Sequence, residues 1–220
     1  TSFILCGAMF LVLRGYFGFD RRSSSEICSI FHHVIVVVLA VDSLHLHRDD
    51  IPHNSVLSQS RSFGGANTIQ WINIGYFLYD SVHAVMWEHG FIVHHIVALS
   101  GFLVSDYVGL GGLGNVMNTL IAEIGSIMYN VYNKNKSPSN YLCFVVIYGI
   151  SRLVFAVWTC WVFRQLWIGY IDSASHYQGF IVFVFIFQSL LVCVNAHFLW
   201  IHLRKASRVL RQVCTKQKLG

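Results

Sequence analysis

Long runs of hydrophobic residues follow one another along the chain, at 2–17, 27–44, 69–86, 91–108, 113–132, 141–163 and 179–203. These seven runs are continuous, and most are long enough for a helix to cross a hydrocarbon core of about 30 Å. Transmembrane strands would instead alternate apolar and polar residues in segments of about ten residues. The pattern therefore predicts an all-α, polytopic membrane protein with about seven transmembrane helices.

The connections between these runs are short, except for residues 45–68, where Pro52 and a high content of Ser, Gly and Asn indicate a loop. No linker or repeat divides the chain, so we expect one compact membrane domain. The first run is short, but no basic segment precedes it and no clear small-x-small cleavage site follows it. We therefore interpret it as a membrane helix and not as a signal peptide.

Composition supports a membrane protein, because 55% of the residues are hydrophobic and only 11% are charged. A soluble domain usually carries about 25% charged residues. The net charge of +5 is concentrated near the C-terminus, which argues for contact with anionic lipid head groups and against nucleic acid. Six of the 15 basic residues lie there: Arg204, Lys205, Arg208, Arg211, Lys216 and Lys218. Six scattered cysteines form no CxxC or Cys/His pattern, and so suggest neither zinc nor a redox pair.

Loop charges predict the orientation, since cytosolic loops are enriched in Lys and Arg. A cytosolic C-terminus and seven crossings also place residues 18–26, 87–90 and 133–140 in the cytosol. Two of these loops are basic, whereas the basic residues of the opposite loops are partly offset by acidic ones. The residues concerned are Arg21, Arg22, Lys134 and Lys136 on one side, and Arg48, Arg61, Arg164, Asp49, Asp50 and Asp172 on the other.

The most unusual stretch is 80–95, DSVHAVMWEHGFIVHH, where ionisable residues interrupt two hydrophobic runs. Ionisable side chains are costly at membrane depth and by default mark a functional site. Asp80 lies about 9 Å from the cytosolic end of the third helix, at 1.5 Å per residue. His83 shares the helix face of Asp80. The fourth helix opens on the pair His94 and His95.

Other helices also place polar groups in the cytosolic half of the membrane: His32, His33, Glu123, Arg152 and Asn195. Polar side chains in lipid must face the bundle interior, a partner or a water-filled cavity. We therefore expect one shared polar chamber that faces the cytosol. Two alternatives stay open, namely that Glu123 and Arg152 form a buried ion pair that fixes helix packing, and that Asn195 makes an interhelical hydrogen bond.

The histidine pair suggests acid–base or acyl-transfer chemistry. Adjacent helical residues point about 100° apart, so that one histidine can face the chamber while the other packs or orients it. Imidazole is suited to remove a proton from an amine or hydroxyl, or to carry an acyl group. Asp80 could fix the histidine tautomer if it lies within hydrogen-bonding reach. The alternative, that both histidines are only structural, stays open.

We expect no metal at these histidines. Membrane di-iron enzymes carry repeated HxxxH and HxxHH boxes, and His83, His89, His94 and His95 do not form such boxes.

An ordered set of short motifs resembles the TLC-domain family, which includes ceramide synthases, the translocating-chain-associated membrane protein and several lipid-homeostasis proteins. The motifs are FHH at 31–33, GYFLYDS with Asp80, FIVHHIVAL at 91–99, IAEIGS at 121–126, ISRLV at 150–154 and VCVNAHFLW with Asn195. The resemblance implies a TLC domain at 21–208, with a first helix at 1–20 outside it and a basic cytosolic tail at 209–220. It also implies a barrel of six helices around a lipid-accessible chamber in the endoplasmic reticulum membrane.

The resemblance aligns His94 and His95 with the pair that ceramide synthases need to N-acylate a sphingoid base with acyl-CoA. It makes those two and Asp80 the catalytic candidates. The candidates for lining the lipid chamber are His32, His83, Glu123, Arg152 and Asn195. One departure is clear: ceramide synthases carry an HDxSDxxLE-type run on the fifth helix, whereas this chain reads NTLIAEIGS without paired aspartates. The pattern is closer to the short TLC domain-containing proteins.

Three functions follow as hypotheses. The first is a protein that binds or regulates membrane lipids and so affects sphingolipid, ceramide or phospholipid composition. The second is a lipid N-acyltransferase of ceramide-synthase type, with acyl-CoA as co-substrate and no other cofactor. The third is a factor for sorting or translocating membrane proteins. In each case the expected partners are membrane lipids with fatty acyl chains, and a homodimer stays open.

Overall fold

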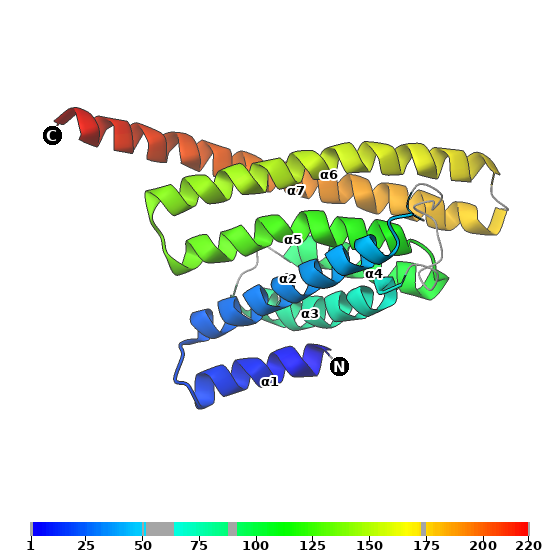
Figure 1. The fold of residues 1–220 in the computed structure, drawn as a ribbon, viewed down its shortest axis with the longest axis horizontal. Coiled ribbons are helices and arrows are strands. Elements are labelled where there is room, and N and C mark those ends of the chain that lie inside the picture. Colours follow the sequence, from blue (N-terminus) through cyan, green and yellow to red (C-terminus); the bar gives the residue numbers. More distant parts are fainter. Residues whose placement is uncertain (1, 50, 52–63, 88–91, 173–174, 220) are drawn as a thin grey trace.

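The computed structural model describes residues 2–49, 51, 64–87, 92–172 and 175–219. Within these residues the fold is all-α, which confirms the predicted class. The helices are α1 Ser2–Gly15, α2 Arg21–Leu46, α3 Ala66–Trp87, α4 Ile92–Val108, α5 Gly112–Lys134, α6 Pro138–Asp172 and α7 Ser175–Leu219. They lie roughly parallel or antiparallel to one another (Figure 1).

Local sequence fixes where two of these helices start. The Asp20 side chain accepts a hydrogen bond from the backbone N–H of Ser23 at 3.0 Å and so caps α2. Before α5, Gly109 and Gly111 adopt positive φ angles of 75° and 91°, a region that glycine enters without steric cost. These glycines allow the tight turn between α4 and α5.

By length and composition, three helical stretches within the described residues can cross a membrane: Arg21–Leu46, Pro138–Ile171 and Gln178–Arg211. Two shorter apolar helices are Ser2–Gly15 and Ile92–Val108. A helical membrane protein is therefore confirmed, while seven crossings stay a prediction. The difference arises because α3 and α5 carry many of the buried polar residues, among them Gln70, Asn73, Thr119, Glu123 and Asn130.

Six helices form a closed ring of contacts. In spatial order each packs against the next, from α2 to α3, α4, α7, α6, α5 and back to α2. Helix α1 packs outside this ring, against α2 and α3, and lies at one edge of the bundle (Figure 1). The ring surrounds a central space. The side chains at each end of the ring determine whether that end is closed or open.

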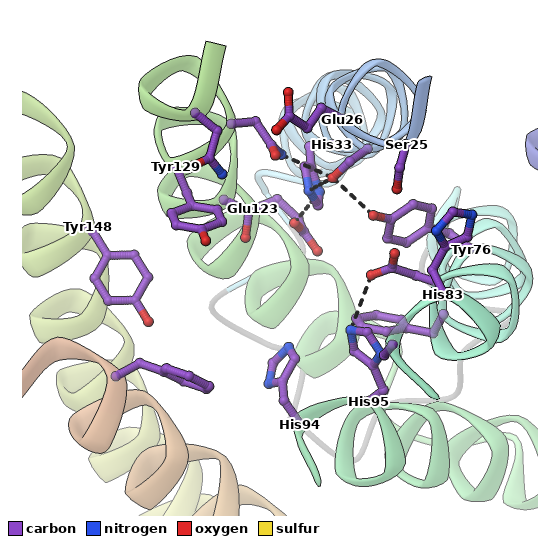
Figure 2. A pocket seen from close by; sticks show the side chains of 18 of the residues that line it. Ser25, Glu26, His33, Tyr76, His83, His94, His95, Glu123, Tyr129 and Tyr148 are labelled. Carbon is purple, nitrogen blue, oxygen red and sulfur yellow. Dashed lines mark hydrogen bonds and ion pairs between the residues drawn. The ribbon is translucent and has the colours of Figure 1, made fainter. Parts of the chain in front are cut away.

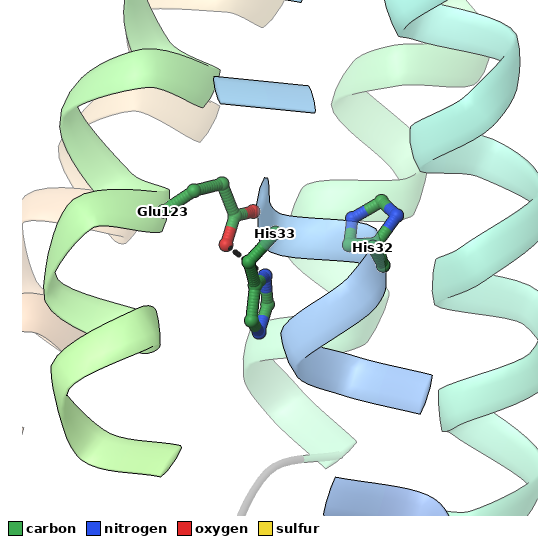
Figure 3. A group of neighbouring side chains, drawn as sticks. All are labelled: His32, His33 and Glu123. Atoms are coloured by element: carbon green, nitrogen blue, oxygen red, sulfur yellow. Dashed lines mark ion pairs between the residues drawn. The ribbon is translucent and has the colours of Figure 1, made fainter. Parts of the chain in front are cut away.

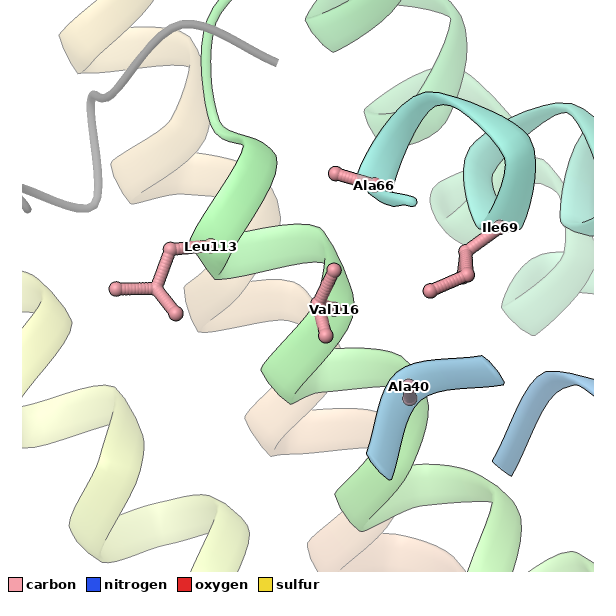
Figure 4. Packing of buried hydrophobic residues seen from close by; sticks show 5 residues of the cluster. All are labelled: Ala40, Ala66, Ile69, Leu113 and Val116. Atoms are coloured by element: carbon pink, nitrogen blue, oxygen red, sulfur yellow. The ribbon is translucent and has the colours of Figure 1, made fainter. Parts of the chain in front are cut away.

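One end of the ring is closed by small and branched apolar side chains. Ala40, Ala66, Ile69, Leu113 and Val116 are buried together where α2 ends and where α3 and α5 begin (Figure 4). Just beyond this cluster, Asn73 Nδ2 donates a hydrogen bond to Thr119 Oγ1 at 2.8 Å and links α3 to α5. Bonds of this kind satisfy polar groups that have no water available in a bilayer. A second cluster, which is mainly aromatic, holds α6 against α7, with Tyr141, Phe144, Val145, Tyr148 and Ala206 at its core.

Helix α1 approaches the ring at Gly75. A Cβ atom added there would lie 1.7 Å from Ser2 Oγ and 2.8 Å from the Phe3 nitrogen. We therefore expect Gly75→Ala to destabilise the protein by about 1–3 kcal/mol through overpacking. Gly7→Ala on α1 is the matched control, because a Cβ there meets nothing within 4 Å and alanine favours the helix by up to about 1 kcal/mol. Unfolding of the purified protein by SDS titration measures both, and equal stability of the two variants would contradict this account of the α1–α3 contact.

Candidate functional site

A polar cavity of about 370 Å³ opens at the end of the ring where α2 and α6 begin. All six ring helices contribute side chains to its wall, whereas no described residue of α1 lines it. The sequence predicts eight candidates for catalysis or for lining the lipid chamber. Seven of them line this cavity: Asp80, His83, His94, His95, Glu123, Arg152 and Asn195. Segments that are far apart in the sequence thus meet at one cavity.

One wall of the cavity comes from α3 and α4. His95 Nε2 lies 3.2 Å from Asp80 Oδ2, so Asp80 is close enough to orient the ring of His95. The His94 ring lies beside that of His95, with 5.8 Å between the ring centroids, and both rings contact Phe77 edge-on. His83 also lines the cavity, and its ring packs against that of Phe10 of α1, with 4.8 Å between the ring centroids.

The opposite wall comes from α2 and α5, as Figure 2 shows. His33 Nδ1 lies 2.5 Å from Glu123 Oε2, and both side chains are less than one-tenth exposed. The other ring nitrogen of His33, Nε2, lies 2.8 Å from Ser29 Oγ. The same Ser29 oxygen accepts hydrogen bonds from Tyr76 OH and Asn130 Nδ2, each at 3.0 Å. A connected polar network therefore joins α2, α3 and α5 at this wall.

His32 lies behind this wall and is not among the residues that line the cavity. Its ring stacks on Tyr76, with centroids 3.8 Å apart and the planes inclined by 7°. Figure 3 shows His33, not His32, turned toward Glu123. The place on the wall that we expected for His32 is thus occupied by its neighbour, because consecutive helical residues point about 100° apart.

His32, His33 and Glu123 also form a group whose potential metal-ligand atoms all lie within 4.8 Å of one another. Both His33 nitrogens already have partners, in Glu123 and Ser29, so a metal ion would have to displace one of them. The expectation of no metal was based on the histidines between 83 and 95, of which His89 lies outside the described residues. It stays a prediction.

Arg152 does not form an ion pair with Glu123, one of the two possibilities that the sequence left open. Its Nη1 donates to the carbonyl of Ala122 at 3.2 Å and to Ser151 Oγ at 3.3 Å. The guanidinium lies over the Tyr148 ring, 4.3 Å from the centroid. This cation–π contact helps to hold a positive charge at the cavity wall.

A second cavity of about 130 Å³ continues from the first between α4, α5, α6 and α7. It is mainly apolar, with Val97, Phe102, Phe155, Phe183 and Leu191 in its wall. We call it the apolar arm, and the first cavity the polar chamber. The two share six lining residues: Phe77, His94, Glu123, Ser126, Arg152 and Asn195. Charged and polar side chains therefore stand where the polar chamber meets the apolar arm.

Several residues of the site were not singled out by sequence reasoning. Ser29, Tyr76 and Asn130 are uncharged at neutral pH, so they lack the large cost at membrane depth that marked the ionisable residues. The spacing of Ser29 and His33, one helical turn apart, is the only signal that could have revealed their contact. His202, another residue that the sequence did not single out, lines the polar chamber, and its ring packs at 90° to Phe144.

The fold and the site define a helical membrane protein with a polar chamber that leads into an apolar arm. A family model described as the TLC domain matches residues 22–203. The chain therefore belongs to the TLC-domain family, as its motifs predicted. No curated protein and no solved structure matched the chain.

Proposed function

We propose that this protein binds an amphipathic membrane lipid inside the ring of helices and thereby acts in lipid homeostasis. The observation that carries the proposal is the junction of the polar chamber with the apolar arm. A ligand that fits both parts has a polar head and a hydrocarbon chain, since binding sites match apolar walls to apolar ligand surface and use a few polar groups for orientation. Membership of the TLC-domain family supports a lipid over other amphiphiles.

The head group would lie between the two polar walls. Arg152 and Asn195 stand at the junction, where they can hydrogen-bond a phosphate, hydroxyl or amide. The chain would extend along Val97, Phe102 and Leu191 toward the closed end of the ring. Sphingolipids, ceramides and phospholipids all have this shape.

The closed order of ring contacts supports a barrel of the TLC type, with α1 outside it. In our proposal the chamber opens to the cytosol in the endoplasmic reticulum membrane. Arg21 and Arg22 line the open end, and the basic stretch of α7 extends from the same end of the bundle. This concentration of positive charge supports a cytosolic orientation.

Lipid extracted from the detergent-purified protein tests the proposal. We expect mass spectrometry of the intact complex to detect one lipid per chain, and fragmentation to identify its head group and chain. A protein that elutes as a folded species without bound lipid, and that takes up none from mixed micelles of phospholipid, ceramide and sphingoid base, would contradict it.

Acyl transfer is a second candidate, and a specific observation favours it. Asp80 pairs with His95, and His94 stands at the junction where a thioester or ester carbonyl would lie. Asp80 could hold the His95 imidazole and stabilise its protonated form, while His94 serves as general base or acyl carrier. Acyl-CoA is the proposed co-substrate, with its phosphates near Arg21 and Arg22 at the open end.

A further inference from the structure

We propose that Ser29, His33 and Glu123 form a nucleophile–base–acid triad that carries a fatty acyl group on Ser29 during transfer from a thioester or ester. This centre is separate from the His94, His95 and Asp80 group on the facing wall. It rests on the proposed lipid-binding cavity, because the apolar arm would hold the chain of the acyl donor.

The geometry is that of an activated hydroxyl. Ser29 Oγ lies 2.8 Å from His33 Nε2, and His33 Nδ1 lies 2.5 Å from Glu123 Oε2. Nucleophilic hydroxyl sites need this order of contacts, with the base oriented by a third group. Ser29 and His33 lie one turn apart on α2, so the helix fixes their separation, and Glu123 reaches them from α5.

All three side chains line the polar chamber. Ser29 is half-buried, whereas His33 and Glu123 are buried. The nucleophile is thus the most accessible member of the triad, and its base and acid are shielded from bulk water. Such an order is expected for a reacting group and is not required of a purely structural network.

Two further donors surround the Ser29 oxygen. Tyr76 OH and Asn130 Nδ2 each lie 3.0 Å from it and hold it in the unreacted state. As Ser29 attacks a carbonyl, one of these donors must release the serine oxygen. The released donor group then lies close to the carbonyl oxygen of the acyl donor, where negative charge develops. A hydrogen-bond donor at that position stabilises the developing oxyanion.

The proposed step balances without a redox partner. Ser29 Oγ forms a bond to the carbonyl carbon of the acyl donor, and its proton passes to His33 Nε2. The carbon–sulfur or carbon–oxygen bond then breaks, and the same proton leaves with the thiol or alcohol. An amine, hydroxyl or water next attacks the Ser29 ester and loses its proton to His33, and the hydroxyl of Ser29 is restored.

A serine-directed fluorophosphonate with a long alkyl chain tests the proposal on the full chain in detergent. We expect a covalent adduct at Ser29, located by peptide mass spectrometry. Ser29→Ala should abolish the adduct, and His33→Gln should slow its formation by at least about 100-fold, the lower range for a general base. Ser189→Ala is the matched control and should label as the wild type does, because Ser189 lines neither cavity and donates its hydroxyl to the Phe185 carbonyl of its own helix.

The outcomes separate this inference from the lipid-binding proposal. Two results would contradict the triad and leave the lipid-binding proposal standing. One is wild-type protein that retains lipid but forms no adduct at Ser29. The other is His33→Gln protein that is labelled at the wild-type rate. Wild-type protein that retains no lipid overturns the proposed function instead. If the variants fail to fold, the position of the adduct in the wild-type protein tests the proposal by itself. An adduct at Ser29 supports the triad, and an adduct at another serine instead contradicts it.

Discussion

Glu123→Ala is expected to destabilise the protein by about 1–3 kcal/mol, the cost of leaving a buried hydrogen-bonding group without its partner. Glu123 is 6% exposed and lies 2.5 Å from His33 Nδ1. Without the carboxylate, the His33 ring loses its partner in an environment of low dielectric constant. The nearby charge of Arg152, at the same cavity wall, also loses a compensating negative charge. SDS titration of the purified protein measures the loss.

Glu26→Ala is the control for this prediction. Glu26 has two cationic partners, Arg22 at 2.9 Å and Lys134 at 3.5 Å, and more than a third of each basic side chain is exposed. Exposed ion pairs contribute at most about 1 kcal/mol, so we expect the loss to be no larger than that. Glu123→Gln should fall between the two, because the amide keeps a hydrogen-bonding oxygen. Equal losses for Glu26→Ala and Glu123→Ala would show that the buried pair has no special role.

Acyl transfer, if it is the activity of the site, should fall by about 10²–10⁴-fold in His95→Ala, the range for loss of a general acid or base. The reason is the 3.2 Å contact of His95 Nε2 with Asp80, which orients the imidazole at the chamber wall. The acyl-transfer rate of His94→Ala should fall by a similar factor, since His94 stands where the polar chamber meets the apolar arm. Turnover of acyl-CoA with a sphingoid base, monitored by release of free thiol, measures both.

His45→Ala should leave this turnover unchanged, because His45 is exposed near the far end of α2. Asp80→Asn provides a finer test. It preserves the shape of the side chain but removes the negative charge beside His95, so the loss should be seen in the maximal rate and not only in the apparent affinity for acyl-CoA. No turnover in the folded wild type, over several acyl lengths and several acceptors, would eliminate the acyl-transfer candidate and leave lipid binding.

Much of the architecture could be predicted from the chain because hydrophobic run length is a strong physical signal. Each apolar run corresponds to one helix, and the ends differ by at most three residues except in α2, α6 and α7, which extend further than the apolar pattern. The cost of placing Asp80, Glu123 and Arg152 in a membrane also required an enclosed polar space. The structure places all three at one cavity.

The details of the site depended on helix rotation and packing, which one sequence does not encode in an obvious way. His32 and His33 are equivalent in a pattern of residues, yet only His33 lines the chamber. The partner of Glu123 could not be chosen between His33 and Arg152 without knowing which helices are neighbours. The apolar arm was unpredictable for a similar reason, because its volume depends on how rings such as Phe102 and Phe183 fill the space between four helices.

The central claim is that the ring of helices encloses a lipid site, and Gly101→Trp tests it most directly. Gly101 lines the apolar arm, and a Cβ there meets nothing within 4 Å, so the indole can occupy the arm without displacing the backbone. Leu103→Trp is the matched control, because Leu103 is on the same helix but 45% exposed, away from the arm. The measurement is the number of lipid molecules retained per chain, by mass spectrometry of the intact complex. We predict one lipid for the wild type and for Leu103→Trp, and none for Gly101→Trp. Equal retention by the two tryptophan variants would contradict the claim.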